Sequence, residues 1–280
     1  MYMYASFMGK REILRLMLES PKSLLLRNWE RKFASRFGFL VFRMLGYPLD
    51  IRQRHMRIIL SNFLKNTKTN DVLDVGCSIG YDCFALATKK DCTVLGIDID
   101  NTSIQLANDI KNVLDCRNTE FQLTDIMKGS IENKQFDTVI FFEVLEHIQD
   151  DAEAIRQVHR LLKPEGSLLL AVPYSEKAEK FVVPKAAFSL KEKAKTEGEF
   201  IGGYHWRKGY NEETLSTLLR NGGFKLEDLR TIRIPKIIFK HDQNKFGFFL
   251  LYPLSRLLSR FSKNKRGLVA KAVKVPSNFS

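Results

Sequence analysis

The sequence predicts an α/β protein with a doubly wound, seven-stranded and mostly parallel sheet, preceded by an N-terminal helical cap. Short apolar runs rich in β-branched residues alternate with helical patterns, which is typical of parallel strands covered on both faces. A glycine-containing turn follows the first of these runs, and an acidic residue ends the second. With 280 residues, the chain is long enough for one α/β domain with additions and a large core.

The residues from Asp71 to Asp98 indicate one strand–turn–helix–strand unit. VLDV predicts a buried strand, GCSIG a sharp bend, and TVLGI a second strand that ends on Asp98. Gly76 and Gly80 bracket the bend, where the missing Cβ atoms permit positive φ and let a ligand lie against the backbone. An acid at the end of the second strand is placed to bind the hydroxyl pair of a ribose. The unit therefore predicts a nucleotide-type cofactor site.

The spacing of the bend favours a cationic cofactor over a dinucleotide. A dinucleotide loop needs glycine at three set positions, and Ser78 and Tyr81 stand where two of them should be. Asp74, two residues before Gly76, would repel a pyrophosphate but suits a cofactor with a cationic amino group. Here the sequence resembles the class I S-adenosylmethionine (SAM)-dependent methyltransferases, whose first motif is much like LDVGCSIG. Ser78 replaces the third glycine that is usual in that family.

The elements before this unit are predicted to form a basic helical cap over residues 1–69. Residues 22–45 mix apolar side chains with Arg, which favours one or two amphipathic helices that cap the active site or lie on a membrane. Asp50 is predicted to cap a further helix that ends at Lys65. The expected apolar face of that helix comprises Ile51, Ile58, Ile59 and Phe63.

The elements after the unit continue the strand–helix alternation over the remaining domain, residues 70–280. Asn101 or Thr102 is expected to cap a helix that runs to about Leu114. A second helix is expected from Ala152 to Leu162, ended by a KPEG turn, and Asn211 should cap a third, EETLSTLLR. The later strands are predicted at TEFQL (119–123), FDTVIFF (136–142), SLLLAVPY (167–174), KLEDLRTIRI (225–234) and GLVAKAVKV (267–275), the last inserting antiparallel.

The resemblance covers roughly residues 71–173, with four motifs in the family's order. Within the family, the sequence is similar in particular to the branch that contains ubiquinone-pathway and other small-molecule methyltransferases. The resemblance implies that Asp98 binds the ribose, that Asp125 contacts the adenine amino group with Ile126 beside the ring, and that Asp74 and the backbone of 76–80 hold the methionine part. From the residues alone, Asp125 could also be a turn residue, but its position directly after a predicted strand favours a ligand contact. The predicted cofactor-binding set is Asp74, Gly76, Cys77, Gly80, Asp98, Ile99, Asp125, Ile126 and Glu143.

The string EVLEH follows the fourth strand, and a helical turn there would place Glu143, Glu146 and His147 on one face. Two branches of the resembled family use such a cluster to hold a divalent metal, and the RNA-methylating one adds a distant histidine, for which His205 is the counterpart here. In many metal-free relatives, His147 would instead line the acceptor side. We predict His147 and His205 as catalytic residues and no resident metal, with a metal site of Glu143, Glu146, His147 and His205 as the alternative. Histidines held only by structural hydrogen bonds are the remaining interpretation.

Charge is distributed unevenly along the chain. Residues 1–70 carry 14 Lys and Arg against 4 Asp and Glu, residues 71–175 carry 9 against 18, and residues 176–280 carry 22 against 10. Two basic flanks around an acidic module indicate an anionic partner such as a membrane surface, a phosphorylated acceptor or nucleic acid, although lysines can also merely solubilise helices.

Two segments stand out in the C-terminal flank. Residues 174–210 are predicted to line the acceptor, with aromatic and donor side chains at Tyr204, His205, Trp206 and Arg207. Residues 241–266 place an apolar run before clustered cations, which favours an interfacial anchor, with an apolar lid or a dimer contact as the alternatives. The run is too short to cross a bilayer.

Together these features predict SAM-dependent methyl transfer to an oxygen, less readily to nitrogen or carbon, of a small-molecule, glycan or lipid-linked acceptor. The alternatives are an RNA 2′-O-methyltransferase with a Glu/His metal site, and a non-catalytic adaptor at a membrane. No N/D-P-P-Y/F run follows the fourth strand, so methylation of a flipped base is not expected and nucleic acid ranks lower as a partner. Four cysteines without C-x-x-C spacing indicate a reducing, cytoplasmic location, with peripheral attachment to the inner face of a membrane as an option.

Overall fold

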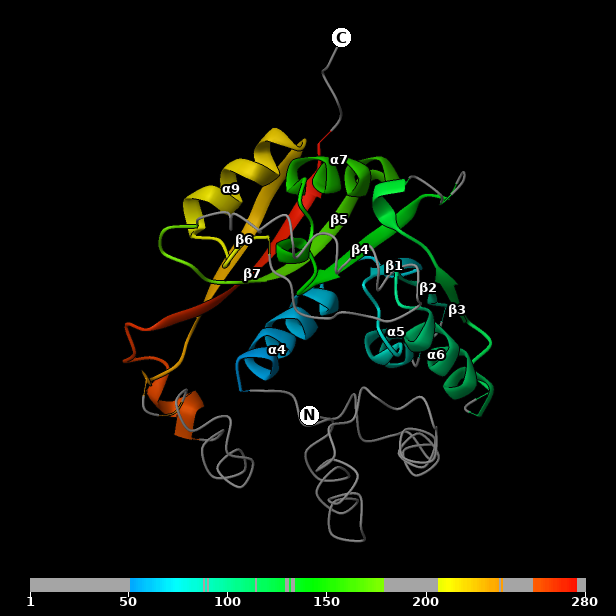
Figure 1. Ribbon diagram of the computed structural model, residues 1–280, viewed down its shortest axis with the longest axis horizontal. Coiled ribbons are helices and arrows are strands. Elements are labelled where there is room, and N and C mark those ends of the chain that lie inside the picture. Colours follow the sequence, from blue (N-terminus) through cyan, green and yellow to red (C-terminus); the bar gives the residue numbers. More distant parts are fainter. Residues whose placement is uncertain are drawn as a thin grey trace, which may run out of the picture.

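The computed structural model describes residues 51–87, 89, 91–113, 115–128, 131, 134–178, 206–236, 238 and 254–275 (Figure 1). Several predictions fall outside the described residues. These are the first fifty residues of the cap, the residues Tyr204 and His205 with most of the acceptor-side segment, and the apolar half of the 241–266 insertion.

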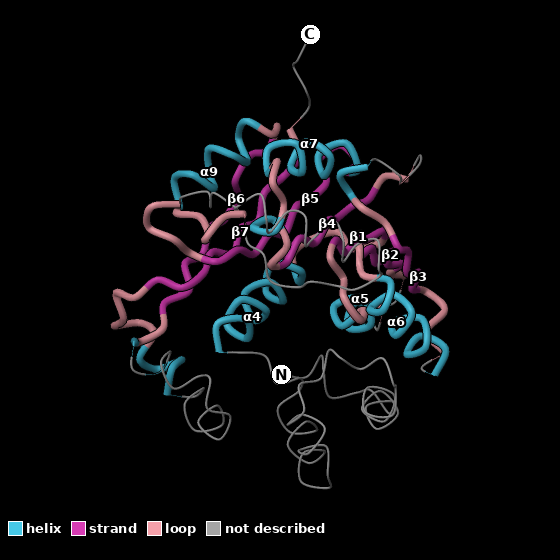
Figure 2. Tube along the Cα trace, viewed as in Figure 1, coloured by secondary structure: helices cyan, strands magenta, loops and turns pink. Residues whose placement is uncertain are grey.

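The described residues form a seven-stranded sheet of order β3-β2-β1-β4-β5-β7-β6 (Figure 2). Pairing is parallel from β3 through to β5, whereas β7 runs antiparallel between β5 and β6. The predicted doubly wound, mostly parallel sheet and its antiparallel seventh strand are therefore confirmed. The strands are β1 Asp71–Val75, β2 Thr93–Asp98, β3 Thr119–Leu123, β4 Phe136–Phe142, β5 Leu162–Pro173, β6 Phe224–Arg233 and β7 Lys265–Lys274.

Helices cover both faces of the sheet. In Figure 1, α4, α5 and α6 lie on one side, and α7 and α9 lie on the other. The largest apolar cluster joins the sheet to α7 and α9, and a second one lies under α5 and α6. Among the described residues, no helix combines the length and the apolar character that a bilayer span requires. The helices are α4 Ile51–Lys65, α5 Tyr81–Leu86, α6 Asn101–Val113, α7 Asp151–Leu161 and α9 Glu212–Asn221, with short 3-10 turns η2 Ile126–Lys128 and η3 Leu145–His147.

The helix caps confirm one prediction and correct another. Asn211 caps α9 through a reciprocal pair of bonds with Thr214, as expected. The cap of α6 is Asp100 rather than Asn101 or Thr102, because the Asp100 carboxylate accepts the Thr102 and Ser103 backbone N–H groups at 3.2 and 3.0 Å. A capping oxygen reaches the second and third N–H groups of a helix from the residue just outside it, which here is Asp100.

Helix α4 packs on the sheet largely with the expected side, because Ile51 is buried and Ile59 and Phe63 pack against apolar clusters, and Ile58 is the exception. Ile58 is 36% exposed, whereas Met56 and Leu60 are buried. Two residues correspond to about 200° around an α-helix, so Ile58 must point away from the side that Met56 buries. The buried set of α4 is Ile51, Met56, Leu60 and Leu64.

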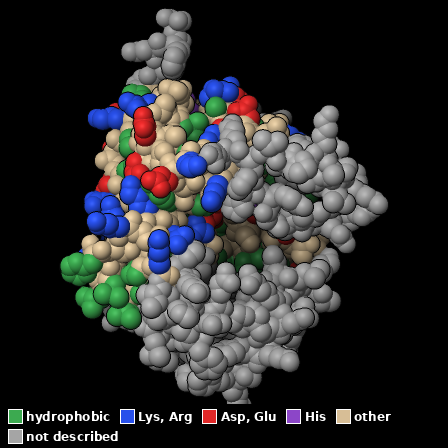
Figure 3. All heavy atoms as spheres, turned by 60° about the vertical axis from the view of Figure 1, so that its left-hand side comes forward, with side chains coloured by type: hydrophobic (Ala, Val, Ile, Leu, Met, Phe, Trp, Pro, Cys, Tyr) green, Lys and Arg blue, Asp and Glu red, His purple; other side chains and the backbone are tan. Residues whose placement is uncertain are grey.

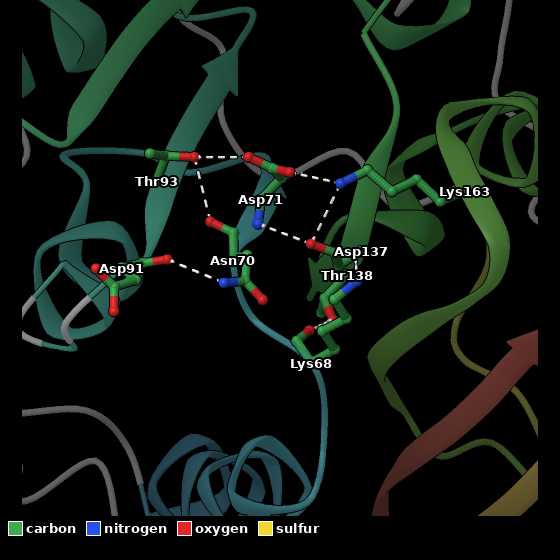
Figure 4. A network of polar contacts seen from close by, with 8 residues as sticks. All are labelled: Lys68, Asn70, Asp71, Asp91, Thr93, Asp137, Thr138 and Lys163. Atoms are coloured by element: carbon green, nitrogen blue, oxygen red, sulfur yellow. Dashed lines mark hydrogen bonds and ion pairs between the residues drawn. The ribbon is translucent and has the colours of Figure 1, made fainter.

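The amino-terminal ends of the central strands are joined by a polar network (Figure 4). Lys163 bridges the carboxylates of Asp71 and Asp137 at 2.5 and 3.3 Å, and the Asp71 N–H donates to Asp137 at 3.1 Å. Thr93 donates to Asp71 at 2.9 Å. Lys163 lies in the KPEG segment, which was predicted as a turn. The segment falls within β5 but forms an irregularity there, because the β4–β5 register shifts opposite it and Glu165 has φ of 60°. This edge of the sheet is therefore closed by ion pairs, and the carboxyl edge remains for a ligand.

Candidate functional site

The turn between β1 and α5 is fixed against β2. Gly76, Ser78 and Gly80 all have positive φ, at 71°, 49° and 80°. The backbone N–H groups of Gly76 and Cys77 both donate to the Ile97 carbonyl, at 2.8 and 3.0 Å. The sharp bend predicted from GCSIG is therefore confirmed.

Packing, as well as the positive φ, explains why both bracketing positions are glycine. A Cβ atom on Gly76 would overlap the side chain of Val144, and one on Gly80 would overlap the rings of Phe121 and Phe84. The space that a side chain would need at these positions is thus filled by the protein itself. The positive φ predicted for both glycines is confirmed, and close approach of a ligand to this backbone stays a prediction.

The carboxylate of Asp98 lies at the carboxyl end of β2, beside the turn. It accepts the Ser78 N–H at 2.8 Å on Oδ2 and the Asp100 N–H at 2.9 Å on Oδ1. Burial raises the pKa of Asp98, and these two bonds oppose that shift. Each carboxylate oxygen has a further lone pair, so two hydroxyl donors of a ligand can still be accommodated.

Two exposed apolar side chains flank Asp98. Ile99, which follows Asp98 directly, is 56% exposed. Leu123, which pairs with Asp98 in the β2–β3 register, is 54% exposed. Large apolar side chains at the end of parallel strands offer a surface for a flat ring. Leu123 escaped the sequence prediction, although its position as the last residue of the predicted strand TEFQL was an available signal.

Asp125 and Ile126 have clear structural partners. One oxygen of Asp125 accepts the Met127 N–H at 3.0 Å, which starts η2. The Thr124 N–H donates to the Asp98 carbonyl at 2.9 Å and so holds Asp125 near the end of β2. Ile126 is only 6% exposed and belongs to the main core. The structure therefore gives Asp125 the turn function that its sequence context allowed, while its position next to Asp98 also suits a ligand contact.

Asp74 lies beneath the turn rather than on its surface. It is 3% exposed and accepts a hydrogen bond from the Cys83 thiol at 3.3 Å. Burial, followed by the nearby Asp82, raises the pKa of Asp74 to about 8. Cys77 is also buried, so its contribution to the turn is made by its backbone.

These residues fit a cationic nucleoside cofactor. Asp98 offers acceptors for ribose hydroxyls, and Ile99 and Leu123 offer apolar surface beside it. Asp74 and Asp82 place carboxyl groups around the same turn. A bound cation would lower the raised pKa of Asp74 and favour its ionised form, whereas a pyrophosphate would not.

The end of β4 differs from the predicted helical turn. Glu143 has φ of 57°, and the 3-10 turn begins only at Leu145. The expectation that Glu143, Glu146 and His147 share one helical face is therefore wrong. A positive φ at Glu143 turns the chain out of the strand before any helical geometry can form.

Arg52 from α4 binds the Glu143 carboxylate. Nη1 of Arg52 donates to Oε1 at 2.9 Å, and Nη2 pairs with Oε2. The two side chains are 17% and 12% exposed. Sequence reasoning missed Arg52 because the partners are 91 positions apart and no local pattern joins them.

Glu146 is the most deeply buried carboxyl group of this region, at 1% exposure. Its Oε2 accepts no hydrogen bond from the described residues. Burial, with Glu143 adding to it, raises the pKa of Glu146 well above its ordinary value. His147 ends η3 and is half-buried. Within the described ranges, no group of three or more His, Cys, Asp or Glu side chains is arranged to hold a metal ion, and His205 lies outside those ranges.

The described end of the acceptor-side segment is anchored at the same place. The Trp206 and Arg207 N–H groups donate to the Glu146 carbonyl at 2.8 and 3.2 Å. The Arg207 guanidinium binds Asp151 through Nε and Nη2, both at 2.8 Å, and the Tyr210 hydroxyl donates to the same carboxylate at 3.0 Å. The structure thus brings the backbone of Trp206 and Arg207 to Glu146 and places the Arg207 guanidinium on Asp151, and their contact with an acceptor stays a prediction.

Arg57 is a second α4 residue that sequence reasoning missed. Its guanidinium pairs with Asp82 and lies over the rings of Tyr81 and Phe142, 5.0 and 4.7 Å from their centroids. Tyr81 and Asp82 begin α5, and Phe142 ends β4. Arg52 and Arg57 therefore attach α4 to both sides of the site.

Residues 66–222 match a family described as a methyltransferase domain. A ubiquinone biosynthesis O-methyltransferase from Pseudomonas paraeruginosa is 32% identical over 56% of this chain, and an O-methyltransferase from Pyrenophora dematioidea is 27% identical over 44%. Phosphoethanolamine N-methyltransferase 3 from Arabidopsis thaliana is 35% identical over 35% of the chain. These alignments span 66%, 46% and 20% of the relatives' own lengths, so the chain matches only part of each.

Solved structures share the fold. The cyclase SpnF superposes with a TM-score of 0.54 at 19% identity and covers 80% of each chain. Phosphoethanolamine N-methyltransferase 2 from Haemonchus contortus, solved with S-adenosylhomocysteine, gives 0.51 at 18% identity over 88% of this chain and 60% of its own. The family match covers more than half of the sequence, and the sheet order and these superpositions agree with it. The chain therefore belongs to the class I SAM-dependent methyltransferase family.

Proposed function

We propose that the protein transfers the methyl group of SAM to an oxygen of a small-molecule, glycan or lipid-linked acceptor. The observation that carries this proposal is the Asp98 carboxylate, fixed by Ser78 and Asp100 beside the glycine turn and flanked by exposed apolar surface. Relatives named as O-methyltransferases support oxygen as the acceptor atom.

Each part of the site then has a role in binding SAM. Asp98 accepts the ribose hydroxyls, and Ile99 and Leu123 cover the base, next to Asp125. Asp74 and the 76–80 backbone form the acidic side of the site, where the methionine part lies. Bound SAM supplies an electrophilic methyl group, so catalysis depends mainly on orienting the acceptor and excluding water.

The acceptor side lies at the end of β4. Glu143 is held by Arg52, and the buried Glu146 carries an oxygen to which no described residue donates. We assign the removal of the acceptor proton to His147 or His205, since a neutral imidazole is a suitable base near neutral pH.

The four cysteines are free thiols, which supports a reducing, cytoplasmic location.

Methyl transfer from tritium-labelled SAM tests the proposal. Purified protein is incubated with separate lipid, RNA and soluble small-molecule fractions of a cell extract, with Asp98→Asn as the matched control. Label in an alkali-stable ether of a small molecule or lipid, absent with the variant, is the expected result. Label only in RNA, abolished by a chelator, would favour the RNA 2′-O-methyltransferase with a Glu/His metal site.

Nitrogen is the second candidate acceptor atom, because relatives named phosphoethanolamine N-methyltransferase are 35% identical to this chain over 35% and 36% of its length. Phosphoethanolamine is therefore included as a defined acceptor, and its methylation would replace the oxygen assignment. SAM binding without label in any fraction would favour the non-catalytic adaptor.

A further inference from the structure

The residues before β7 form a short helix with its apolar side facing outward. Residues 254–258 are helical and continue into a turn through 261. Leu254, Leu257 and Phe261 follow the helical spacing i, i+3, i+7 and are 43%, 64% and 80% exposed. Three large apolar side chains in solvent on one short helix are unusual for a soluble surface.

The core does not need these three side chains, because the opposite side of the helix already packs inward. Ser255 is fully buried, and its hydroxyl lies 3.0 Å from Nε2 of His55 in α4. Leu258 packs against the apolar cluster that contains Ile51 and Met56. The helix is therefore anchored to α4 by one side and presents its apolar side to solvent.

Cations surround this apolar side. Arg256, Arg260 and Lys263 are exposed and form no ion pair with the described residues. The sequence contains no Asp or Glu after Asp242, whereas eight Lys and Arg follow it. Figure 3 shows hydrophobic side chains gathered at the lower left of the molecule, with Lys and Arg side chains close by.

The helix lies at the same edge of the sheet as the cofactor site. Gly267, two residues after the start of β7, pairs with Pro173 at the end of β5. The neighbouring parallel strand, β4, leads into Glu143, whose N–H donates to the Ala171 carbonyl of β5 at 2.8 Å. A partner bound to the helix would therefore face the side on which the acceptor enters.

We propose that Leu254, Leu257 and Phe261, with Arg256, Arg260 and Lys263 around them, dock the protein on an anionic bilayer surface. Apolar side chains enter the headgroup–acyl boundary, and the cations contact anionic headgroups. An acidic protein surface would satisfy the cations but would not accommodate three large apolar side chains, whereas a bilayer provides both. The proposal is independent of the methyl acceptor, because binding to vesicles needs no SAM.

Vesicle co-sedimentation of the full-length protein tests the proposal. Vesicles of phosphatidylcholine alone are compared with vesicles in which about one lipid in three is phosphatidylserine. Binding to the anionic vesicles, lost at high salt and at least tenfold weaker to the neutral ones, is expected because the cations act within a Debye length.

Two double variants separate the apolar and cationic contributions. Leu257→Ser/Phe261→Ser and Arg260→Gln/Lys263→Gln should each weaken binding by roughly tenfold or more. Arg220→Gln/Lys225→Gln is the matched control, because Arg220 lies near the end of α9 and Lys225 near the start of β6, and both are exposed. It should bind as the unaltered protein does, and thermal melting should show that all three variants are folded.

Equal binding to neutral and anionic vesicles, or unchanged binding by Leu257→Ser/Phe261→Ser, would overturn the proposal. The proposal would also fail if the unaltered protein bound no vesicles and had a molar mass above that of one chain, while Leu257→Ser/Phe261→Ser had the mass of one chain. That result would assign the face to a second copy. SAM affinity, measured on the same samples, reports separately on the proposed function.

Discussion

Arg52 of α4 and Glu143 at the end of β4 are joined by a two-contact ion pair across the site, with Nη1 and Oε1 2.9 Å apart. Burial, and after it Glu143, raises the pKa of Glu146, and Arg52 balances the charge of Glu143. The pair attaches α4 to the strand end where the acceptor is proposed to bind.

A double-mutant cycle of Arg52→Gln and Glu143→Gln measures this pair. Each single variant should lower the free energy of unfolding, because each leaves one partly buried charge without its partner. The double variant should recover part of the loss, with a coupling free energy of about 1–3 kcal/mol. Chemical denaturation of the four proteins gives the value. Additive effects of the two substitutions would show that the pair does not hold α4 in place.

The anchor of the acceptor-side segment predicts a graded loss of stability. Asp151→Asn removes the charge that binds Arg207 and should lower the free energy of unfolding by about 3 kcal/mol. Tyr210→Phe removes one hydrogen bond to the same carboxylate and should cost about 1–2 kcal/mol. Urea unfolding of both variants checks the order. A larger effect of Tyr210→Phe would contradict the central role given to the Arg207–Asp151 pair.

His55 predicts a pH dependence of stability. Burial, with Arg256 and Arg54, lowers the pKa of His55 from 6.5 to about 4. Between these two values the unfolded chain binds the proton more tightly than the folded one, so stability falls as the pH is lowered from 6.5 towards 4. The contribution lost from this group is about 3 kcal/mol at most.

His55→Gln keeps a polar partner for Ser255 and removes the titration. The difference in unfolding free energy between the variant and the unaltered protein should therefore change steadily in favour of the variant below pH 6.5. Thermal or urea unfolding at several pH values provides the measurement. A difference that is constant from pH 7 to pH 4 would show that His55 titrates normally in the folded protein.

The apolar surface beside Asp98 predicts an effect on binding without an effect on folding. Ile99→Ser and Leu123→Ser should each raise the dissociation constant for SAM by about tenfold, because each removes apolar area covering the base. Both side chains are more than half exposed, so the melting temperature should stay close to that of the unaltered protein. Val275→Ser, an exposed residue just after β7, is the control and should affect neither quantity. Unchanged SAM affinity in both site variants would mean that the base lies elsewhere.

Most of the fold could be predicted from the sequence because its central strands are short apolar runs and its edge strands alternate apolar and polar residues. TEFQL and FDTVIFF match β3 and β4 to the residue. Errors arose where one backbone angle or one cap decides the geometry. Asp100 rather than Asn101 caps α6, and the positive φ of Glu143 prevents the helical turn that the spacing of EVLEH suggested.

The site could be predicted where its residues follow a strand directly, as Asp98 follows TVLGI. It could not be predicted where contacts join distant segments. Arg52 and Arg57 reach Glu143 and Asp82 only because α4 packs across the sheet, and the sequence of α4 carries no sign of those partners. The positive φ of Gly76 and Gly80 could be predicted, but their packing against Val144 and Phe121 could not, since those residues come from other elements.

The central claim is that the glycine turn and Asp98 together bind SAM, and calorimetric titration of the purified protein with SAM tests it most directly. The unaltered protein should bind with one site per chain, and Asp98→Asn, which can keep the bond from Ser78 but loses the charge, should bind about a hundredfold more weakly. A variant that remains folded and binds SAM within threefold of the unaltered protein would contradict the account.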